Sequence, residues 1–299
     1  MPEQTLIASN TSALSISALG ASTRRPEKVI GIHFFYPAHV MKLIEVIPGL
    51  ATSEETVADA VAFCEGLRKI PVRVNECAGF LVNRLLMPYL NEAAFCAEEG
   101  SASLKEIDAA MAAFGFPMGP FTLVDTIGLD ICHDVVGVLL EEYGQRMCQA
   151  RIWEEIYQKK RYGVKSGAGF YNYNTSLSGD KTVEEILTGL SKPSPAKRAP
   201  FSQDRLLLAM INEAAFCLQE HIASPSDIDV AVLAGIGFPQ AKGGLLQYAD
   251  SLGMDSVLAQ LTELYEIYGA RFFPAPLLKR MVRAGFLGKK SKRGFLEYH

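Results

Sequence analysis

Several residue patterns are scarce or missing in this sequence. Only five histidines occur among 299 residues, so a histidine-rich metal cluster is not expected. The six cysteines include no C-x-x-C pair, which argues against a zinc site or a disulfide framework and predicts reduced thiols in a cytoplasmic protein. No apolar run approaches the ~18 residues that cross a bilayer, so no membrane span is expected. The formal net charge of −4 disfavours a nucleic-acid binder.

The first 76 residues alternate short apolar runs with amphipathic stretches. Because hydrophobic residues make up 49% of the chain, a sizeable core is available, and the length predicts two or three domains. The Thr5–Ser9 run has no polar alternation, which is typical of a strand buried on both faces. We predict an α/β unit with strands at Thr5–Ser9, Val29–Phe35, Lys42–Ile47 and Ile70–Asn75, the last at an edge, and helices at Thr11–Leu19 and Thr52–Arg68.

The pattern becomes helical after Gly79, and the helical part is repeated. Asn91–Cys96 and Asn212–Cys217 both read NEAAFC, at an offset of 121 residues. The predicted helices of the first copy are Phe80–Glu99, Ser103–Phe114 with a Ser103/Glu106 capping box, Leu123–Glu142 and Ile152–Arg161. Further matches follow in the same order at offsets that rise slowly to 125, as when K-S-G-A-G-F at 165–170 recurs as K-S-K-R-G-F at 290–295. Ordered self-similarity of this kind predicts a duplicated all-α domain.

A histidine and a glutamate lie on neighbouring predicted strands. His33 is part of VIGIHFF, and Glu45 is part of the apolar run KLIEVI, where a buried carboxylate needs a partner. If the two strands form a hairpin centred near position 39, His33 lies directly opposite Glu45. A carboxylate in that place would orient the imidazole as a general base. The alternative is a histidine with a purely structural role in the core.

Three further polar positions are candidates for a site. Ser12 and Asn10 follow the first strand in S-N-T-S, at the end of a strand where α/β sheets bind ligands, although turn and cap chemistry would also explain them. Asn83 stands among apolar residues in GFLVNR and either caps locally or reaches into a site. Lys165 falls in a loop and could equally be a solvated lysine. In the second copy the positions of Asn83 and Arg84 hold Asp204 and Arg205, and no His/Glu hairpin precedes them, so we expect one site only.

Taken together, these motifs resemble the 3-hydroxyacyl-CoA dehydrogenase family. The resemblance rests on S-N-T-S after a strand, H-F-F-x-P with a glutamate twelve residues after the histidine, G-F-x-V-N-R, G-F-P-M-G-P and K-x-G-x-G-F-Y, and it covers nearly the whole chain. The duplicated helical domain resembles the α subunit of the fatty-acid oxidation complex. The implied organisation is a partial Rossmann-type α/β sheet at 1–76, helical copies at 77–175 and 201–299, and a linker at 176–200.

The resemblance also implies chemistry. His33 would be the catalytic base and Glu45 its partner; Ser12 and Asn83 would contact the substrate, while Ser12 and Lys165 would lie near the cofactor NAD. The implied reaction is oxidation of a 3-hydroxyacyl-CoA to the 3-oxoacyl-CoA in β-oxidation. The implied partners are the acyl-CoA substrate and, by analogy, a thiolase subunit.

One family feature is missing from the 299 residues. The glycine-rich G-x-G-x-x-G turn that cradles the pyrophosphate does not occur. We therefore expect residues 1–76 to supply the second half of a dinucleotide-binding domain, with the edge of Thr5–Ser9 left open. On its own such a chain would bind NAD weakly, and a polypeptide carrying the first four strands would complement it. The alternative function is a non-catalytic assembly or binding module of a fatty-acid oxidation complex.

Overall fold

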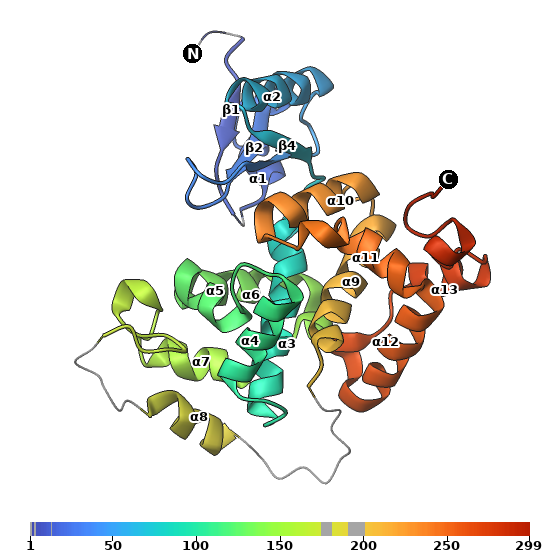
Figure 1. The fold of residues 1–299 in the computed structure, drawn as a ribbon. Helices are drawn as coiled ribbons and strands as arrows, with labels where there is room; N and C mark the ends of the chain where they lie inside the picture. The colour runs from blue at the N-terminus through green and yellow to red at the C-terminus, as the bar shows by residue number, and fades with distance from the viewer. Residues whose placement is uncertain (1, 3, 13, 175–180, 191–200) are drawn as a thin grey trace.

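The computed structural model describes residues 2, 4–12, 14–174, 181–190 and 201–299. An α/β unit formed by the first residues stands on a larger helical body (Figure 1). Its four strands form one sheet in the order β1-β2-β3-β4. They are β1 (Ile7–Ser9), β2 (Val29–Phe34), β3 (Leu43–Pro48) and β4 (Ile70–Arg73). The predicted α/β class is therefore observed, with β4 at an edge as expected.

The strands pair in a mixed pattern. β1 runs parallel to β2, β2 and β3 form an antiparallel hairpin, and β3 runs parallel to β4. Within the described residues β1 has a sheet neighbour on one side only. For that reason Ile7 and Ser9 are half-buried and Ala8 is exposed, so the expectation of a strand buried on both faces is wrong.

The helices of the α/β unit begin later than predicted. They are α1 (Ile16–Ala21), the short 3₁₀ turn η1 (Pro26–Lys28) and α2 (Glu54–Gly66). Ser15 and Ser53 cap α1 and α2, so the helices begin after Thr11 and Thr52, the predicted first residues. The Thr52 hydroxyl instead donates to the Val29 carbonyl of β2 at 2.6 Å, so it serves the sheet rather than the helix. Residues 10–14 accordingly form a loop beyond β1.

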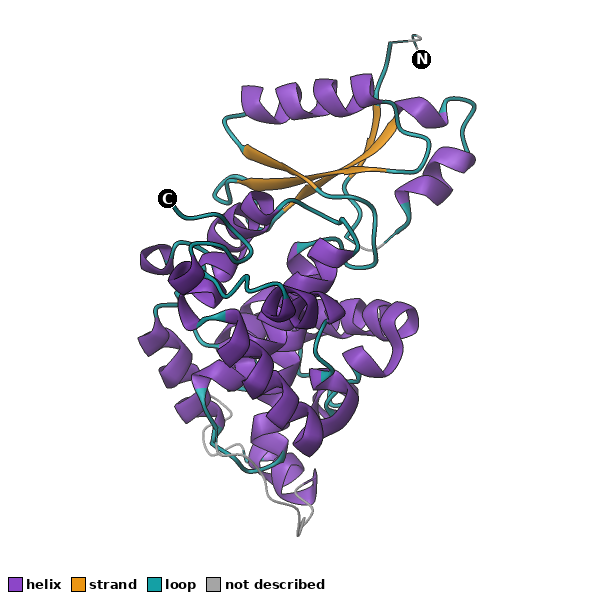
Figure 2. Ribbon diagram, turned by 90° about the vertical axis from the view of Figure 1, so that its right-hand side faces the viewer, coloured by secondary structure: helices purple, strands orange, loops and turns teal. Residues whose placement is uncertain are grey.

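The two central strands, β2 and β3, are buried on both faces of the sheet. One face packs against α2, and the other faces α1 and the helical body (Figure 2). The α2 face is a small apolar cluster, and its buried members are Ile30, Ile32, Ile44, Val46, Val57, Ala60 and Cys64. Because side chains alternate along a strand, His33 and Glu45 project from the opposite face, toward the helical body.

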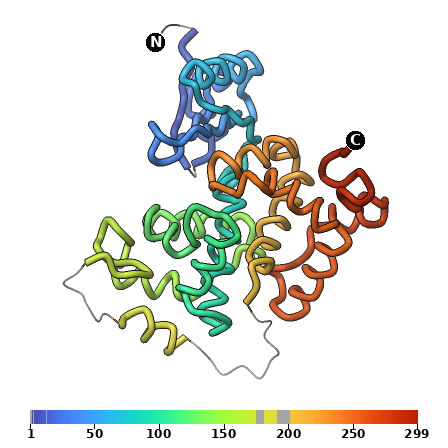
Figure 3. Tube along the Cα trace, viewed as in Figure 1, coloured from blue at the N-terminus to red at the C-terminus, as the bar shows by residue number. Residues whose placement is uncertain are grey.

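The helical body contains two segments with the same order of α-helices, and the second segment adds the short elements η5 and η6. The first has α3 (Val82–Glu98), α4 (Leu104–Phe114), α5 (Pro120–Ile127), α6 (Leu129–Tyr143), η2 (Gly144–Met147), α7 (Arg151–Gln158) and η3 (Val164–Ser166). The second has α9 (Gln203–Gln219), α10 (Pro225–Ala231), η5 (Val232–Ile236), η6 (Gln240–Lys242), α11 (Leu245–Leu252), α12 (Met254–Tyr268), η7 (Gly269–Phe272), α13 (Pro276–Arg283) and η8 (Lys289–Ser291). Helices α3 and α9 pack along each other and share one continuous apolar core (Figures 1 and 3).

Two expectations about the helices need correction. The stretch predicted as one helix at 123–142 is broken at Gly128, whose φ of 112° is unfavourable for residues with a side chain, and Gly253 breaks the second copy in the same way. The predicted linker contains α8 (Thr182–Leu190), which buries Val183, Ile186 and Leu190 against the first copy. Residues 176–180 and 191–200 of that linker lie outside the described residues. Within the described chain, no helix is both long and apolar enough to span a bilayer.

Candidate active site

The two side chains predicted to form a pair do meet. Residues 33 and 45 are direct partners in the β2–β3 ladder, which confirms the predicted register. The His33 Nδ1 atom lies 2.7 Å from Glu45 Oε2. Both residues are buried, with 5% of His33 and none of Glu45 exposed. A buried carboxylate needs a charged or hydrogen-bonding partner, and the imidazole supplies one.

The second carboxylate oxygen of Glu45 is bound by the first turn of α3. Glu45 Oε1 accepts the backbone N–H groups of Leu81 at 3.0 Å and Val82 at 2.8 Å. The first N–H groups of a helix have no partner within the helix and carry a partial positive charge, so a carboxylate placed there is stabilised. The N-cap residue of α3 provides no side-chain cap of its own. Glu45 therefore caps α3 from a neighbouring strand while it holds His33.

This arrangement sets the tautomer of His33. Because Glu45 Oε2 is an acceptor, the hydrogen-bond network assigns the imidazole proton to Nδ1 and leaves Nε2 unprotonated, as an acceptor. The Ser12 hydroxyl lies 3.0 Å from Nε2 and donates to it. Nε2 is thus the atom able to take a proton from a bound molecule, with Ser12 beside it.

Ser12 is held in place by the loop after β1. The Asn10 side-chain oxygen accepts the Phe34 N–H of β2 at 2.9 Å, and the Thr11 hydroxyl accepts the Leu14 N–H at 2.8 Å. These bonds fix the loop at the carboxyl end of the parallel pair, the edge at which α/β sheets bind ligands. Asn10 consequently has a local structural contact, whereas Ser12 points to the imidazole.

Two aromatic rings border His33. The Phe35 ring packs edge-on at 4.7 Å between ring centroids, and the Phe80 ring lies at 5.7 Å. Phe80 has a φ of 49° and follows Gly79 at 71°, so two successive left-handed residues turn the chain into α3. That turn brings Phe80 against His33 and the next two amides against Glu45. The amides are site groups that the sequence analysis missed, and the G-F pair is their only sequence signal.

Asn83 follows directly after those amides. It is half-buried, and within the part of the chain that the structure describes its carboxamide makes no hydrogen bond. A carboxamide offers both donors and an acceptor, so Asn83 has unused capacity beside the Glu45 contact.

Lys165 lies elsewhere. Its ammonium group pairs with the Asp130 carboxylate at 2.5 Å, within the helical segment. The matching Lys290 pairs with Asp255 at 2.5 Å in the second copy, where no dyad exists. The helical fold thus accounts for Lys165, and the geometry lends no support to the predicted contact with the cofactor.

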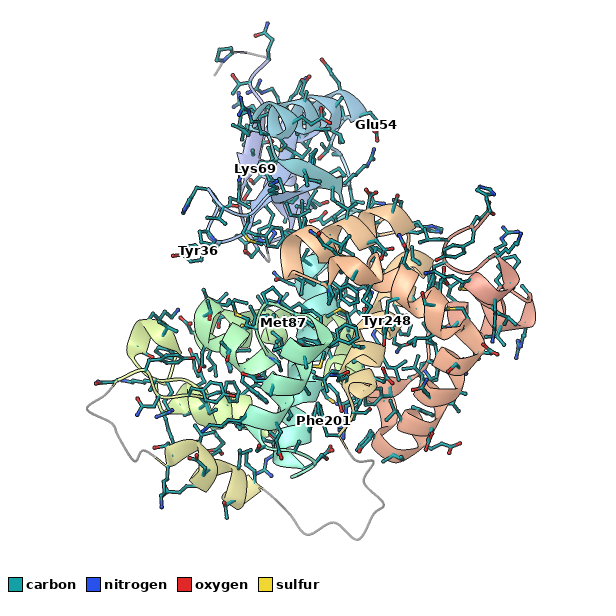
Figure 4. The ribbon with its side chains drawn as sticks, viewed as in Figure 1. Tyr36, Glu54, Lys69, Met87, Phe201 and Tyr248 are labelled. Carbon is teal, nitrogen blue, oxygen red and sulfur yellow. The ribbon has the colours of Figure 1, made fainter. Side chains whose placement is uncertain are left out.

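Lys69 is a second residue that the sequence analysis missed. Its ammonium group donates to the carbonyls of Ala38 at 2.5 Å and Met41 at 2.7 Å, which braces the hairpin turn after His33. The same turn carries Tyr36, which is 89% exposed and projects from the lower end of the α/β unit (Figure 4).

No group of three or more metal-ligating side chains occurs among the described residues. The site is therefore an imidazole–carboxylate pair with an adjacent hydroxyl, bordered by aromatic rings.

Sequence comparisons identify the family. Residues 79–173 and 201–298 match the C-terminal domain of 3-hydroxyacyl-CoA dehydrogenase, and residues 1–77 match the NAD-binding domain of the same enzyme. The chain belongs to the 3-hydroxyacyl-CoA dehydrogenase family. The α/β unit matches an NAD-binding domain, so the cofactor is NAD.

Named relatives agree with this family. The chain is 41% identical over 286 residues to a fatty acid oxidation complex subunit alpha of Idiomarina loihiensis, covering 95% of this chain and 40% of the relative. A subunit of the same name from Shewanella amazonensis is 42% identical, with the same coverage. This dehydrogenase-family chain thus spans about 40% of the length of the curated relatives it matches.

Solved structures of the family share the fold. A 3-hydroxybutyryl-CoA dehydrogenase of Escherichia coli is 29% identical with a TM-score of 0.82, covering 95% of this chain and 77% of that one. The dehydrogenase part of a multifunctional enzyme of Caenorhabditis elegans is 29% identical with a TM-score of 0.64, covering 93% of this chain and 65% of that one.

The residues fit one end of the cofactor. The loop after β1 and the imidazole form a polar pair at the sheet edge where a dinucleotide binds, while the glycine-rich turn that holds the pyrophosphate is not among the 299 residues. The described residues therefore supply the loop and the imidazole of such a site, without its glycine-rich turn.

Proposed function

We propose that this chain carries the catalytic half of a 3-hydroxyacyl-CoA dehydrogenase acting in fatty-acid β-oxidation. The observation that supports this proposal is the buried dyad, in which Glu45 holds His33 Nδ1 and leaves Nε2 unprotonated beside the Ser12 hydroxyl. A general base needs a free lone pair on one nitrogen and an oriented ring. His33 meets both requirements.

In this proposal His33 Nε2 removes the proton of the substrate's 3-hydroxyl as C3 becomes a carbonyl. NAD, when bound, accepts the hydride that leaves C3. The imidazolium that forms is stabilised by the Glu45 carboxylate, whose other oxygen accepts the two helix amides. Ser12 and Asn83 are proposed to bind the substrate's 3-oxygen, and Ser12 to border the nicotinamide.

The proposed partners follow from the same family. The substrate is an acyl-CoA, and the glycine-rich half of the NAD site is supplied by further polypeptide, in this chain or in another, beside the edge of β1. A thiolase subunit remains a partner by analogy, because the relatives are named as subunits of a complex. The cytoplasmic location also stays a proposal. The non-catalytic alternative is not supported over the catalytic one, since the dyad is intact.

The test is an NADH-absorbance assay with acetoacetyl-CoA, run with and without an added polypeptide that carries the first four strands. We expect weak turnover by the chain alone and a clear rate after the addition. His33→Ala should then abolish the rate, while His39→Ala, an exposed histidine six residues further along the same hairpin, should retain it. A rate that survives His33→Ala would contradict the proposal.

A further inference from the structure

The duplicated helical copies bury two equivalent charged networks against each other. In one, Arg84 Nε lies 2.7 Å from Glu213, and an Arg84 terminal nitrogen lies 2.7 Å from Glu220. The other joins Arg205 to Glu92 and Glu99 across the same interface. Each arginine matches the other at an offset of 121, and so does each glutamate.

The two networks are closely matched in environment. Arg84 has no exposed side-chain area, and Arg205 has 1%. Each guanidinium also lies over a tyrosine ring, Arg84 over Tyr143 at 4.4 Å and Arg205 over Tyr268 at 4.0 Å. Burial raises the pKa of both partner carboxyls, Glu213 and Glu92. The networks differ in their second arginine, since Arg271 pairs with Glu92 and Glu99 whereas Arg146 lies 3.4 Å from Glu213. A readout local to the first turn of α3 therefore separates the effects of the two arginines.

Their surroundings along the chain differ in one respect. Arg84 lies in the first turn of α3, two residues after the Val82 amide that binds Glu45 and next to Asn83. Arg205 lies in the first turn of α9, which is capped by its own Ser202. In α9 the position of Asn83 holds Asp204, which accepts a hydrogen bond from Tyr248 inside the second copy.

The second copy also holds the chain before α3. The Asn75 backbone N–H donates to the Ile222 carbonyl at 2.8 Å, and its side-chain amide donates to the His221 carbonyl at 2.7 Å. Residues 75–84 are therefore fixed at both ends by α9 and the turn that follows it. Between these ends lie the left-handed Gly79–Phe80 pair and the two amides bound to Glu45.

From this arrangement we infer that Arg84 is a positioning residue for the His33–Glu45 dyad, anchored by Glu213 and Glu220 of the second helical copy. The second copy has no dyad of its own. By fixing the first turn of α3, it sets where the Leu81 and Val82 amides meet Glu45, and so how Glu45 orients His33. This role deepens the proposed function. Its activity measurement rests on that function, whereas its hydrogen-exchange and NMR measurements do not.

The experiment compares Arg84→Met with Arg205→Met in the full chain. Both variants break a buried ion pair, so both should lower the midpoint of denaturant unfolding to a similar extent. Hydrogen exchange followed by mass spectrometry should show faster exchange in the peptide containing Leu81 and Val82 for Arg84→Met only. The downfield proton NMR signal of His33 Nδ1–H should weaken in the same variant only.

Activity is a further readout, measured after addition of the polypeptide that carries the first four strands. A displacement of about 1 Å at a reacting group costs about 100-fold in rate, so we expect a loss of that order in kcat for Arg84→Met and a change within about twofold for Arg205→Met. Equal exchange and equal NMR signals in the two variants would overturn the inference. If neither the parent nor the variants turn over substrate but the exchange difference is present, the proposed function fails and the positioning role stands.

A milder pair covers the case in which the arginine variants do not fold. Glu220→Gln removes the partly exposed partner of Arg84, and Glu99→Gln removes the matching partner of Arg205. Faster exchange at Leu81 and Val82 is expected in Glu220→Gln alone. The same exchange in both glutamine variants would count against Arg84 as a positioning residue.

Discussion

Glu45→Gln tests the central contact of the site with almost no change in side-chain volume. Glu45 accepts three hydrogen bonds, from His33 Nδ1 at 2.7 Å and from the Leu81 and Val82 amides at 3.0 and 2.8 Å. In glutamine one oxygen becomes an NH₂ group, which is a donor. The remaining oxygen can satisfy the two amides, so the NH₂ group would face His33.

This replacement of an acceptor by a donor moves the imidazole proton of His33 from Nδ1 to Nε2. An NH₂ donor at Nδ1 favours the tautomer in which Nε2 carries the proton, and a protonated Nε2 cannot accept a proton from substrate. General base catalysis contributes about 10²–10⁴-fold, so we expect a loss of that size in kcat. Charge-assisted hydrogen bonds exceed neutral ones by about 1 kcal/mol each, and relief of the buried charge offsets part of the loss, so the unfolding free energy should fall by about 2 kcal/mol.

Three measurements are made: NADH formation from NAD and a 3-hydroxyacyl-CoA, urea unfolding, and ¹⁵N NMR of the histidine ring, which reports the tautomer without cofactor. Glu54→Gln is the control, because Glu54 forms an exposed pair with Arg73 at the start of α2, away from the dyad (Figure 4). It should leave the rate and the unfolding midpoint unchanged. Full activity of Glu45→Gln with the Nε2-protonated tautomer would refute the reasoning.

Two further predictions concern the helical copies. Gly169→Ala should cost at least about 2 kcal/mol of stability, since a Cβ there would overlap the Asp125 carboxylate, whereas Gly137→Ala in open helix surface should be neutral or stabilise by about 0.5–1 kcal/mol; denaturant unfolding checks both. Burial raises the pKa of Asp229 from 3.8 to about 6. The folded state then holds that proton between about pH 4 and 6 while the unfolded state releases it, so stability should fall by about 3 kcal/mol as pH rises through this window. Asp229→Asn should flatten that part of the unfolding profile, and a slope that persists in the variant would contradict this cause.

The dyad could be predicted from sequence because few geometric variables were involved. The centre of a hairpin between two apolar strands fixes which residues face each other, and the period of two along a strand fixes the face. The Leu81 and Val82 amides could not be predicted in this way. Backbone groups have no residue signature, and their approach to Glu45 depends on the left-handed turn at Gly79–Phe80.

Helix boundaries show a different limit. Thr52 with Glu55 three residues on has the pattern of a capping box, but the threonine hydroxyl is bonded to β2, and Ser53 caps the helix. Competing tertiary hydrogen bonds of this kind are invisible in a local pattern. Helix α8 was missed for the opposite reason, because its apolar spacing is short and flanked by residues typical of linkers.

The duplication separates residues that serve the fold from residues that serve the chemistry. The lysine–aspartate pair is present in both copies, as Lys165–Asp130 and Lys290–Asp255, although only one copy stands next to a dyad. Because the Lys290–Asp255 pair forms in the copy without a dyad, the fold alone explains this ion pair. Asn83 has no such counterpart, because its matching position is an aspartate bonded inside the second copy. Arg84 belongs to both classes, since its ion pairs recur in the second copy while its place beside the Glu45 contact does not.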